Sequence, residues 1–350
     1  MGAPGPLNLI TDVAGLLVGH AADPRLRSGV TVVLPNARAA CSVDVRGGGS
    51  GTRETDLLRP EAAMSGVDAV CLSGGSAFGL DAASGVMQWL AERGRGFPVR
   101  GHVVPIVPAA ILFDLANGGD KDWGAEPPYR RLGHAACDAA TGGAFPLGNT
   151  GAGFGAMAGK LKGGLGSASW QEADGLMVAA LVAVNPVGSV LTPGNRGFWA
   201  QPWEQGDEFG GLNSAFARDI DLGLAAESRI ARPVPGGDVG GHTCIGVVAT
   251  NSVLDKTGLR QVAAMAHDGL ARAVRPVHTP MDGDTIFALA TAAWQDQGAA
   301  VSRDWLIARV GSIAADCMAR AVARGVWSAT PLEGEDCAAA LLRRQEEGKK

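Results

Sequence analysis

The chain has 350 residues, of which 46% are hydrophobic, so it can bury one large core or two smaller ones. Its formal net charge is −5 at pH 7, and no run of lysines or arginines exceeds two residues, which disfavours a nucleic-acid-binding protein. No basic leader precedes an apolar segment at the N-terminus, and no apolar run is long enough to cross a bilayer. We therefore expect a cytoplasmic protein with no membrane or nucleic-acid partner.

Cysteine and glycine are used in different ways along the chain. The cysteines contain no CxxC pair and no close spacing, so we expect small buried side chains in a reducing compartment. They are Cys41, Cys71, Cys137, Cys244, Cys317 and Cys337. The 52 glycines are about twice the usual share, which is near 7%, and they are clustered. The glycines therefore mark special positions of the backbone. Because the cysteines lack the spacing of a zinc site, we expect no metal, and we expect no cofactor.

Strand and helix patterns alternate along much of the chain. Runs rich in Val, Ile, Thr and Phe predict strands at 31–35, 41–45, 69–73, 177–185, 243–251 and 285–291. Apolar residues at intervals of three and four predict helices at 79–94, 254–274 and 302–323, each with capping residues near its start. This mixture indicates an α/β or α+β fold.

Residues 187–242 interrupt the alternation with a stretch rich in glycine and proline that contains one short helical patch. Loops of this length are usually functional or disordered. We interpret 191–242 as a long loop or linker within a single catalytic domain over 1–350. The last ten residues, LLRRQEEGKK, predict a solvated and fraying end.

Three patterns that suggest familiar sites are incomplete. GFGAMAGK (153–160) has Phe and Leu where a phosphate loop needs Gly and a hydroxyl residue. SGGSAFG (73–79) lacks the second glycine of a nucleophile elbow around Ser76 and is interpreted as a tight turn before the helix. His267 and Asp268 lie in a helical pattern without a second ligand cluster, so a satisfied polar surface is expected there.

Three polar clusters remain as candidates for chemistry. Lys160 follows a glycine run, Asn185 ends a predicted strand, and Asp282 and Asp284 directly precede another strand. Taken singly, each has an ordinary interpretation: a solvated lysine, a turn residue before proline, and a DGD turn. Whether these clusters form one site depends on a segment that could connect them chemically.

The segment GGHTCIGVVATNS (240–252) supplies a connecting hypothesis. If the bond between His242 and Thr243 breaks, Thr243 carries both a hydroxyl nucleophile and an α-amine with a pKa of roughly 7.7–8.0. The amine can accept the hydroxyl proton near neutral pH, so no catalytic histidine is needed. The same hydroxyl could first attack the His242 carbonyl in an N-to-O acyl shift, which flexible glycines at 240 and 241 would permit.

The three clusters fit the needs of such a nucleophile. Lys160 would lower the pKa of the amine by like-charge repulsion, and Asp282 or Asp284 would orient the amine and raise its pKa. Asn185 offers an amide donor to the oxyanion of a tetrahedral intermediate. A strand that merely begins with threonine after a glycine turn is the alternative.

The sequence resembles the self-processing aminopeptidase and amidase family typified by L-aminopeptidase/D-amidase/esterase and the β-peptidyl aminopeptidases. The resemblance covers nearly the whole chain in ordered segments. These are DVRGGGSGTRETDLLRPE (44–61), LSGGSAFGLDAASGVMQWL (72–90), VPIVPAAILFDL (104–115), GNTGAGFGAMAGK (148–160), GGLGSAS (163–169), ALVAVNPVG (180–188), HTCIGVVATN (242–251) and MAHDGLARAVRPVHTPMDGDTIFALAT (265–291).

The resemblance implies a four-layer α-β-β-α sandwich of the type that the self-cleaving ornithine acetyltransferases share. It implies that autoproteolysis frees Thr243 as the nucleophile, giving an α chain of 1–242 and a β chain of 243–350. It also implies an oxyanion role for Asn185 and a homo-oligomer of αβ units, often a tetramer. The nylon-oligomer hydrolases of this family match the chain at Asp282 and Asp284, with a catalytic lysine that corresponds to Lys160.

Two departures from the family pattern bear on processing and specificity. His242 precedes the expected cut where Asn or Gly is more usual, so the efficiency of cleavage is open. Phe113 stands where some relatives have a tyrosine thought to contact the substrate or the oxyanion. The preferred amide, whether an L-peptide, a D-amide, a β-peptide or a nylon oligomer, is open as well.

We therefore expect an N-terminal threonine amide hydrolase that works through an acyl-enzyme ester on Thr243 and takes a small-molecule amide or peptide substrate. Three alternatives remain at this point. The first is an acyltransferase of the ornithine acetyltransferase type, and the second is an uncleaved scaffold or binding protein. The third is a conventional serine hydrolase that uses Ser76.

Overall fold

Two five-stranded sheets face each other in the computed structural model, which describes residues 2–211, 222–231, 242–294, 301–332 and 334–347. The first sheet has the order β1 (Leu16–Asp23), β2 (Ser28–Pro35), β5 (Val70–Ser73), β8 (Ala109–Ile111), β4 (Gly51–Arg53). The second has the order β11 (Gly164–Gln171), β12 (Met177–Val184), β13 (Ile245–Thr250), β14 (Thr285–Ala290), β3 (Ala40–Val45). Two small hairpins pair β6 (Phe97–Val99) with β7 (His102–Val104), and β9 (Met157–Ala158) with β10 (Leu161–Lys162).

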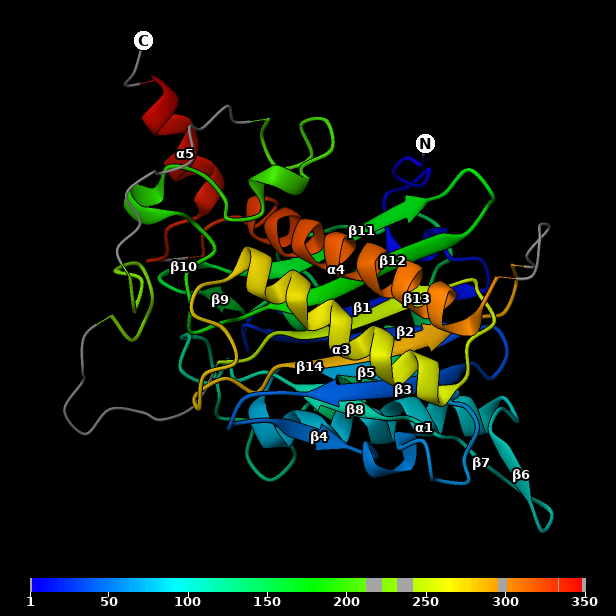
Figure 1. Ribbon diagram of the computed structural model, residues 1–350. Coiled ribbons are helices and arrows are strands. Elements are labelled where there is room, and N and C mark those ends of the chain that lie inside the picture. Colours follow the sequence, from blue (N-terminus) through cyan, green and yellow to red (C-terminus); the bar gives the residue numbers. More distant parts are fainter. Residues whose placement is uncertain (1, 212–221, 232–241, 295–300, 333, 348–350) are drawn as a thin grey trace.

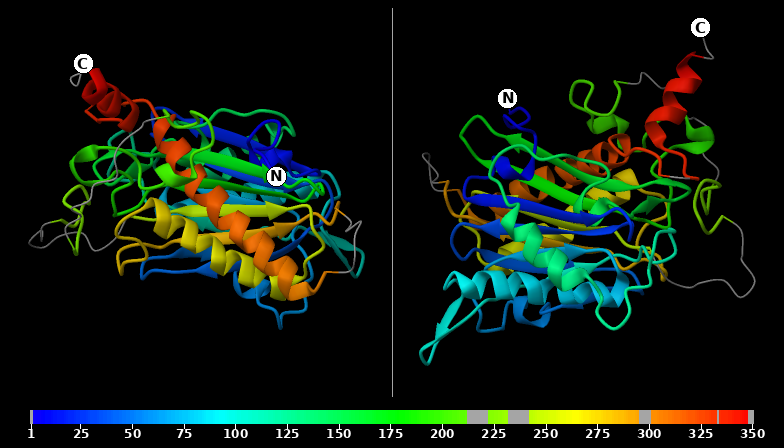
Figure 2. Two further views of the ribbon diagram at one scale, coloured as in Figure 1. Left: turned by 45° about the horizontal axis from the view of Figure 1, so that its top comes forward. Right: turned by 180° about the vertical axis from the view of Figure 1, so that it is seen from behind.

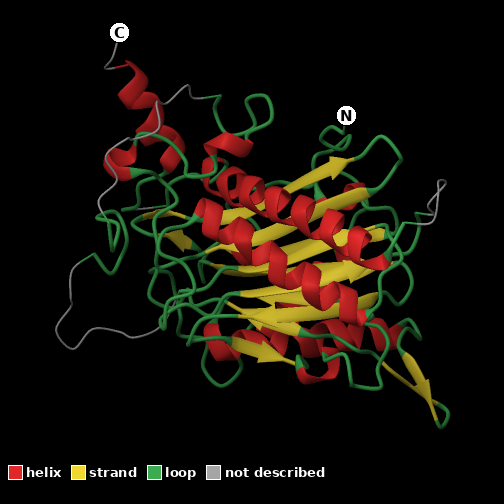
Figure 3. Cartoon of the chain, viewed as in Figure 1, coloured by secondary structure: helices red, strands yellow, loops and turns green. Residues whose placement is uncertain are grey.

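Helices cover the outer face of each sheet. α3 (Lys256–Ala273) and α4 (Arg303–Trp327) lie across the second sheet (Figure 1), and Figure 3 shows both in front of the strands. α1 (Ala82–Glu92) and α2 (Tyr129–Asp138) cover the first sheet and are seen from behind in Figure 2. A short helix, α5 (Ala338–Glu347), follows α4. The expected four-layer α-β-β-α sandwich is confirmed.

Side chains of the central strands alternate between two apolar layers. On β12, Val178, Ala180 and Val182 pack toward α3 and α4. Ala179 and Leu181, between them in sequence, pack toward the first sheet. Because successive strand residues point to opposite faces and both faces are covered, every residue of β12 is buried. The uninterrupted apolar run MVAALVAV follows from this double burial.

The strand directions bring three chain segments to one end of the second sheet. β13 is antiparallel to β12 and parallel to β14, with α3 as the crossover. The C-terminal end of β12 therefore lies beside the N-terminal ends of β13 and β14. The residues just outside these ends are Asn185, Thr243 and the pair Asp282 and Asp284.

The elements with strong periodicity were predicted well, whereas β1, β11, α2, α5 and the shortest strands were missed. All six expected strands occur as β2, β3, β5, β12, β13 and β14, and the three expected helices occur as α1, α3 and α4. Asp255 and Ser302 cap α3 and α4 by accepting backbone N–H groups of Gly258 and Trp305. β11, with the sequence GLGSASWQ, was not predicted because its small residues carry little apolar signal.

The described part of 187–242 is largely irregular, although Phe198, Ala200 and Phe209 belong to the core beneath α4, and its role as a loop or linker stays a prediction. One expectation about an irregular segment requires correction. The tail is not frayed over 338–347, where it forms α5 with Leu342 buried. The short helical patch expected in the loop falls largely on 212–221, outside the described residues. Within the described ranges, no helix is both long and apolar enough to span a membrane.

The close approach of α3 to α4 depends on one glycine. A Cβ atom on Gly269 would lie 2.2 Å from the carbonyl oxygen of Ala315 on α4. No real contact is that short, and backbone cannot yield as a flexible side chain does. A Cβ atom on Gly258, also on α3, would meet the ends of two side chains, Ile307 at 3.3 Å and Arg303 at 3.4 Å.

We predict that Gly269→Ala lowers the free energy of unfolding by about 2–3 kcal/mol, because α4 must move outward. Gly258→Ala is the matched control, in which the helix-propensity gain of about 1 kcal/mol offsets a contact that can relax. Urea denaturation of both variants measures the difference. Equal effects of the two substitutions would contradict this account of the α3–α4 contact.

Candidate active site

The scissile bond proposed from the sequence lies at the end of the second sheet, where the strand ladder continues past the strand ends. The backbone N–H of Thr243 donates to the carbonyl of Asn185 at 2.8 Å. The carbonyl of His242 accepts the backbone N–H of Gly283 at 3.0 Å. The peptide bond between His242 and Thr243 is thus held on both sides by backbone groups.

The hydroxyl of Thr243 is directed back across this bond. Its Oγ1 donates to the carbonyl oxygen of His242, the residue before it. The side chain is only 3% exposed, so the hydroxyl is largely shielded from bulk water. This contact brings the hydroxyl oxygen next to the carbonyl group that an N-to-O acyl shift would attack.

Asn185 is fixed by hydrogen bonds at both ends of its side-chain amide. Oδ1 accepts the Met157 N–H at 2.8 Å, and Nδ2 donates to the Phe113 carbonyl at 3.2 Å. Since a backbone N–H can only donate, the oxygen of the amide must face Met157. The donor end of Asn185 therefore lies on the Phe113 side, and both residues line the same cavity.

The two aspartates are fully buried and bind backbone N–H groups on either side of the Thr243 position. Asp284 Oδ1 accepts Cys244 N–H at 2.7 Å, and its Oδ2 accepts His278 Nδ1–H, also at 2.7 Å. Asp282 Oδ1 accepts Val187 N–H at 3.2 Å. Neither carboxylate bonds directly to Thr243, so in the intact chain they position the backbone around it.

Burial raises the pKa of Asp282, and the neighbouring Asp284 raises it further. Hydrogen bonds from Thr279, through its backbone N–H and its hydroxyl, oppose these two effects. Two carboxyl groups therefore lie in one buried turn, where the presence of Asp284 makes ionisation of Asp282 harder.

The glycine run 47–49 explains how this buried turn is accommodated. A Cβ atom on Gly47 would lie 2.2 Å from the Asp282 carbonyl oxygen, and Gly47 has a φ of +85°. Gly49 N–H donates to the same carbonyl at 2.8 Å. Glycine is needed at 47 because both the contact and the backbone conformation exclude a side chain.

The two lysines of the 157–162 segment differ in their surroundings. Lys160 is exposed, and its Nζ donates to the Ala226 carbonyl at 3.1 Å. Lys162, which the sequence reasoning missed, is 0% exposed and donates to the carbonyls of Ala156 and Gly163 at 2.8 and 2.9 Å. Burial lowers the pKa of Lys162 to about 8.

Lys162 and Asn185 bind opposite ends of one peptide group. The carbonyl of Ala156 accepts from Lys162, and the next N–H, that of Met157, donates to Asn185 Oδ1. A cation on the carbonyl polarises the peptide and strengthens the bond that its N–H makes. Lys162 therefore supports the orientation of Asn185, whereas the structure places Lys160 at the rim.

A cavity of about 680 Å³, called the site cavity below, opens beside His242 and Asn185. Arg229 lines it and was not expected from the sequence. Its Nη1 donates to His242 Nδ1 and its Nε to the Gly159 carbonyl, both at 2.6 Å. Burial, and then the charge of Arg229, lower the pKa of His242 to about 4, so the imidazole accepts as the neutral form.

Other residues singled out from the sequence lie apart from this constellation or play packing roles. His267 is fully buried rather than at a polar surface, with Nε2 on the Asp44 carbonyl at 3.1 Å, which corrects that expectation; Asp268 is exposed. All six cysteines are buried, and Cys244 packs in the core under α3. Ser76 follows Gly75 in the expected tight turn.

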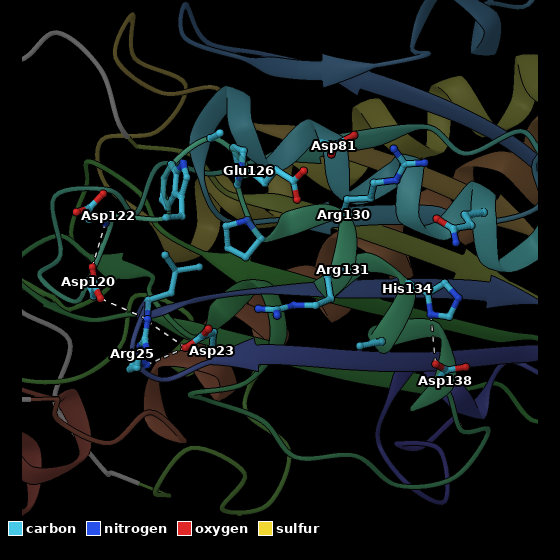
Figure 4. A pocket seen from close by; sticks show the side chains of 17 residues that line it. Asp23, Arg25, Asp81, Asp120, Asp122, Glu126, Arg130, Arg131, His134 and Asp138 are labelled. Carbon is cyan, nitrogen blue, oxygen red and sulfur yellow. Dashed lines mark hydrogen bonds and ion pairs between the residues drawn. The ribbon is translucent and has the colours of Figure 1, made fainter.

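A second cavity of about 1160 Å³ lies over α2 and contains none of the predicted site residues (Figure 4). Four of its charged or titratable side chains form two pairs. Arg25 lies 3.4 Å from Asp120, and His134 lies 3.3 Å from Asp138. Such exposed pairs are typical of a solvated surface.

Comparison with known proteins identifies the family of this chain. The model of peptidase family S58 matches residues 8–339. An uncharacterised aminopeptidase of Mycobacterium tuberculosis is 45% identical over 344 residues, covering 94% of this chain and 96% of the relative. A 6-aminohexanoate-oligomer endohydrolase of Kocuria sp. is 31% identical over 298 residues, covering 80% and 74%.

Solved structures extend the comparison to the fold. The β-aminopeptidase of Burkholderia sp. superposes with a TM-score of 0.68 at 22% identity, covering 99% of this chain and 96% of that chain. The L-aminopeptidase D-Ala-esterase/amidase of Ochrobactrum anthropi, described as a variant of the Ntn-hydrolase fold, gives 0.69 at 20% identity, with coverages of 99% and 96%.

The fold is thus that of the Ntn-hydrolase aminopeptidases. The chain belongs to peptidase family S58 and is a hydrolase.

The two lysines provide a test of the site geometry. We predict that Lys162→Met lowers the free energy of unfolding by about 1–3 kcal/mol, because buried carbonyls lose their donor. Lys160→Met, at an exposed position on the same segment, should change it by less than about 0.5 kcal/mol. Denaturant titration of the two variants decides, and a larger loss for Lys160→Met would contradict the assignment.

The low pKa of His242 predicts a pH dependence of stability. Unfolded histidine takes up a proton near pH 6.5, whereas His242 in the fold does so near pH 4. Between these values the unfolded state binds more protons, so the free energy of unfolding must fall as the pH drops from about 6.5 to about 4. His242→Asn should weaken this slope, because asparagine keeps an acceptor and does not titrate.

The comparison is made between Thr243→Ala and His242→Asn/Thr243→Ala, so that neither chain carries the adjacent hydroxyl. His20 and His267, whose pKa values are also lowered to about 4 by burial, are present in both and cancel. Urea denaturation at pH 4.5 and pH 7 gives the slope. An identical slope in the two proteins would exclude the neutral His242–Arg229 contact.

Proposed function

We propose that this protein is an amide hydrolase whose nucleophile is the N-terminal threonine that self-cleavage between His242 and Thr243 creates. One observation carries the proposal. The Thr243 hydroxyl donates to the His242 carbonyl, the oxygen of that carbonyl accepts Gly283 N–H, and Thr243 N–H binds the Asn185 carbonyl. The nucleophile, the carbonyl carbon that it would attack and a donor to the developing oxyanion therefore meet at one peptide bond.

Self-cleavage follows from this arrangement in two steps. Oγ1 of Thr243 bonds to the His242 carbonyl carbon, the bond from that carbon to the Thr243 nitrogen breaks, and the hydroxyl proton passes to the nitrogen. The Gly283 N–H stabilises the oxyanion of the tetrahedral intermediate. Water then hydrolyses the ester, leaving a carboxylate on His242 and a free amine and hydroxyl on Thr243.

The freed amine makes the second reaction possible. With a pKa of roughly 7.7–8.0 it can take the proton of its own hydroxyl, which then attacks a substrate amide. The new amine lies beside the Asn185 carbonyl, which already accepts Thr243 N–H and fixes its position. The amine half of the substrate leaves first, and water releases the acyl half from Thr243.

The surrounding residues have separate roles in this proposal. Gly283 N–H and the donor end of Asn185 stabilise the oxyanion, and Lys162 holds the peptide that orients Asn185. Asp282 and Asp284 keep the strand ends in register through Val187 and Cys244. Lys160, on the cavity rim, adds positive potential that lowers the pKa of the amine.

The substrates are short peptides or oligoamides. This class follows from two supports: the aminopeptidase and oligomer-hydrolase relatives, and a cavity of about 680 Å³ beside the nucleophile, which suits a few residues of chain. Release of the free acid without an added amine acceptor distinguishes this hydrolase from an acyltransferase.

The nucleophile is tested by three variants. Thr243→Ala should remain a single chain of 350 residues and lose amide hydrolysis, because no hydroxyl is present for either reaction. Thr243→Ser should keep both cleavage and activity, since serine supplies the same groups. Ser76→Ala is the control and should behave as wild type.

Intact-mass analysis together with p-nitroanilide hydrolysis measures both outcomes. An active, cleaved Thr243→Ala protein, or loss of activity in Ser76→Ala alone, would refute the assignment and favour a conventional serine hydrolase.

A further inference from the structure

Arg229 occupies a position in the site cavity that self-cleavage alone does not require. Its backbone N–H donates to the Val187 carbonyl at 3.0 Å, which ties it to the turn that follows Asn185. Nε and Nη1 bind Gly159 and His242. A guanidinium has five N–H donors, and among the described residues no acceptor binds Nη2. Further donors of Arg229 therefore remain for a ligand in the cavity.

The partner of Arg229 belongs to the acyl side of the scissile bond. In self-cleavage, His242 is the acyl group that Thr243 attacks, and its side chain lies in the site cavity. Its Nδ1 is three bonds from Cα, through Cβ and Cγ. Oδ1 of aspartate or asparagine stands at the same number of bonds from Cα. An aspartyl residue in the place of His242 would therefore bring an oxygen to the same guanidinium nitrogen.

The charge of the cavity favours the aspartate over its neutral relatives. Among the described residues that line the cavity, Arg27, Lys160 and Arg229 are cations. Asp114 and Glu335 are the carboxyl groups among these same residues, and burial raises the pKa of Asp114. A bidentate carboxylate contact to arginine is also stronger than the neutral contact that the His242 imidazole makes. A carboxylate can thus displace the imidazole from Arg229.

We propose that Arg229 determines the specificity of the acyl subsite and that the mature enzyme prefers amides of an L-aspartyl residue. Asparaginyl amides follow, because they keep the oxygen and lose the charge, and aliphatic aminoacyl amides come last. This inference rests on the proposed function, since an acyl subsite beside His242 exists only if Thr243 attacks the acyl carbon there. Arg229 makes no covalent bond; it orients the acyl side chain while Thr243 carries out the chemistry described above.

The test compares α-aspartyl, α-asparaginyl and leucyl p-nitroanilides on the wild type, Arg229→Gln and Arg229→Lys. Wild type should hydrolyse them in that order of kcat/KM. Arg229→Gln should reduce the aspartyl-to-leucyl ratio by about tenfold to a hundredfold, mainly through KM, because one charged hydrogen-bond donor is lost. Arg229→Lys should restore part of the ratio, since it keeps the charge and loses the planar fork.

Lys160→Gln is the matched control for a general effect of positive potential. It removes a cation from the rim of the same cavity, so a long-range effect would lower the ratio in both variants, whereas a direct contact lowers it mainly in Arg229→Gln. Intact mass of each variant shows that cleaved chains are compared. A wild type that prefers the leucyl substrate, or an Arg229→Gln variant with an unchanged ratio, would overturn the proposal.

Binding of the free amino acids separates this inference from the proposed function. Isothermal titration of the cleaved wild-type protein with L-aspartate and L-leucine should show tighter binding of aspartate, and Arg229→Gln should abolish the difference. If no anilide is hydrolysed but aspartate binds through Arg229, the reaction proposed for Thr243 fails and the subsite stands. Equal binding of the two amino acids would overturn the subsite.

Discussion

The site depends on the backbone ladder that continues past the ends of β12, β13 and β14. The Thr243 N–H binds the Asn185 carbonyl and the His242 carbonyl binds the Gly283 N–H, by the same type of hydrogen bond that joins the strands themselves. Such a bond fixes position without a mobile side chain. The peptide bond between His242 and Thr243 thus continues the hydrogen-bonded ladder beyond the end of β13.

The double burial of the second sheet makes this position rigid. Every residue of β12, β13 and β14 is buried, with one sheet packed on one face and two helices on the other. A close-packed interior resists displacement. Glycines let backbone approach backbone on both sides of the sheet, at Gly269 between the helices and at Gly47 beside the aspartate turn. Close packing therefore accounts for part of the high glycine content.

The sequence indicated much of this because polar residues stand where long apolar strands end. Four of these polar residues could be named before any fold was known: Asn185, Thr243, Asp282 and Asp284. The strand directions bring them to one end of the second sheet. The four-layer architecture came from resemblance, because periodicity does not reveal which sheet packs on which. β11 was missed because its small residues give a weak apolar pattern, and α5 was missed because its charged tail does the same.

The site residues that the sequence analysis did not identify were missed for a different reason. Lys162 and Lys160 are two positions apart, and only tertiary packing determines which one is buried. Arg229 lies in an irregular segment without periodicity, and its partner His242 is 13 residues away. Gly283 contributes a backbone N–H, which no residue type announces. The sequence alone did not reveal which side chain is buried, where the loop runs, or in which direction a backbone N–H points.

The central claim is that the chain cuts itself between His242 and Thr243. The most direct measurement is intact-mass analysis with N-terminal sequencing of the purified wild-type protein. The account predicts two fragments, 1–242 and 243–350, the second beginning Thr-Cys-Ile-Gly. A chain that stays intact on prolonged incubation at neutral pH, or a cut at any other bond, would contradict it.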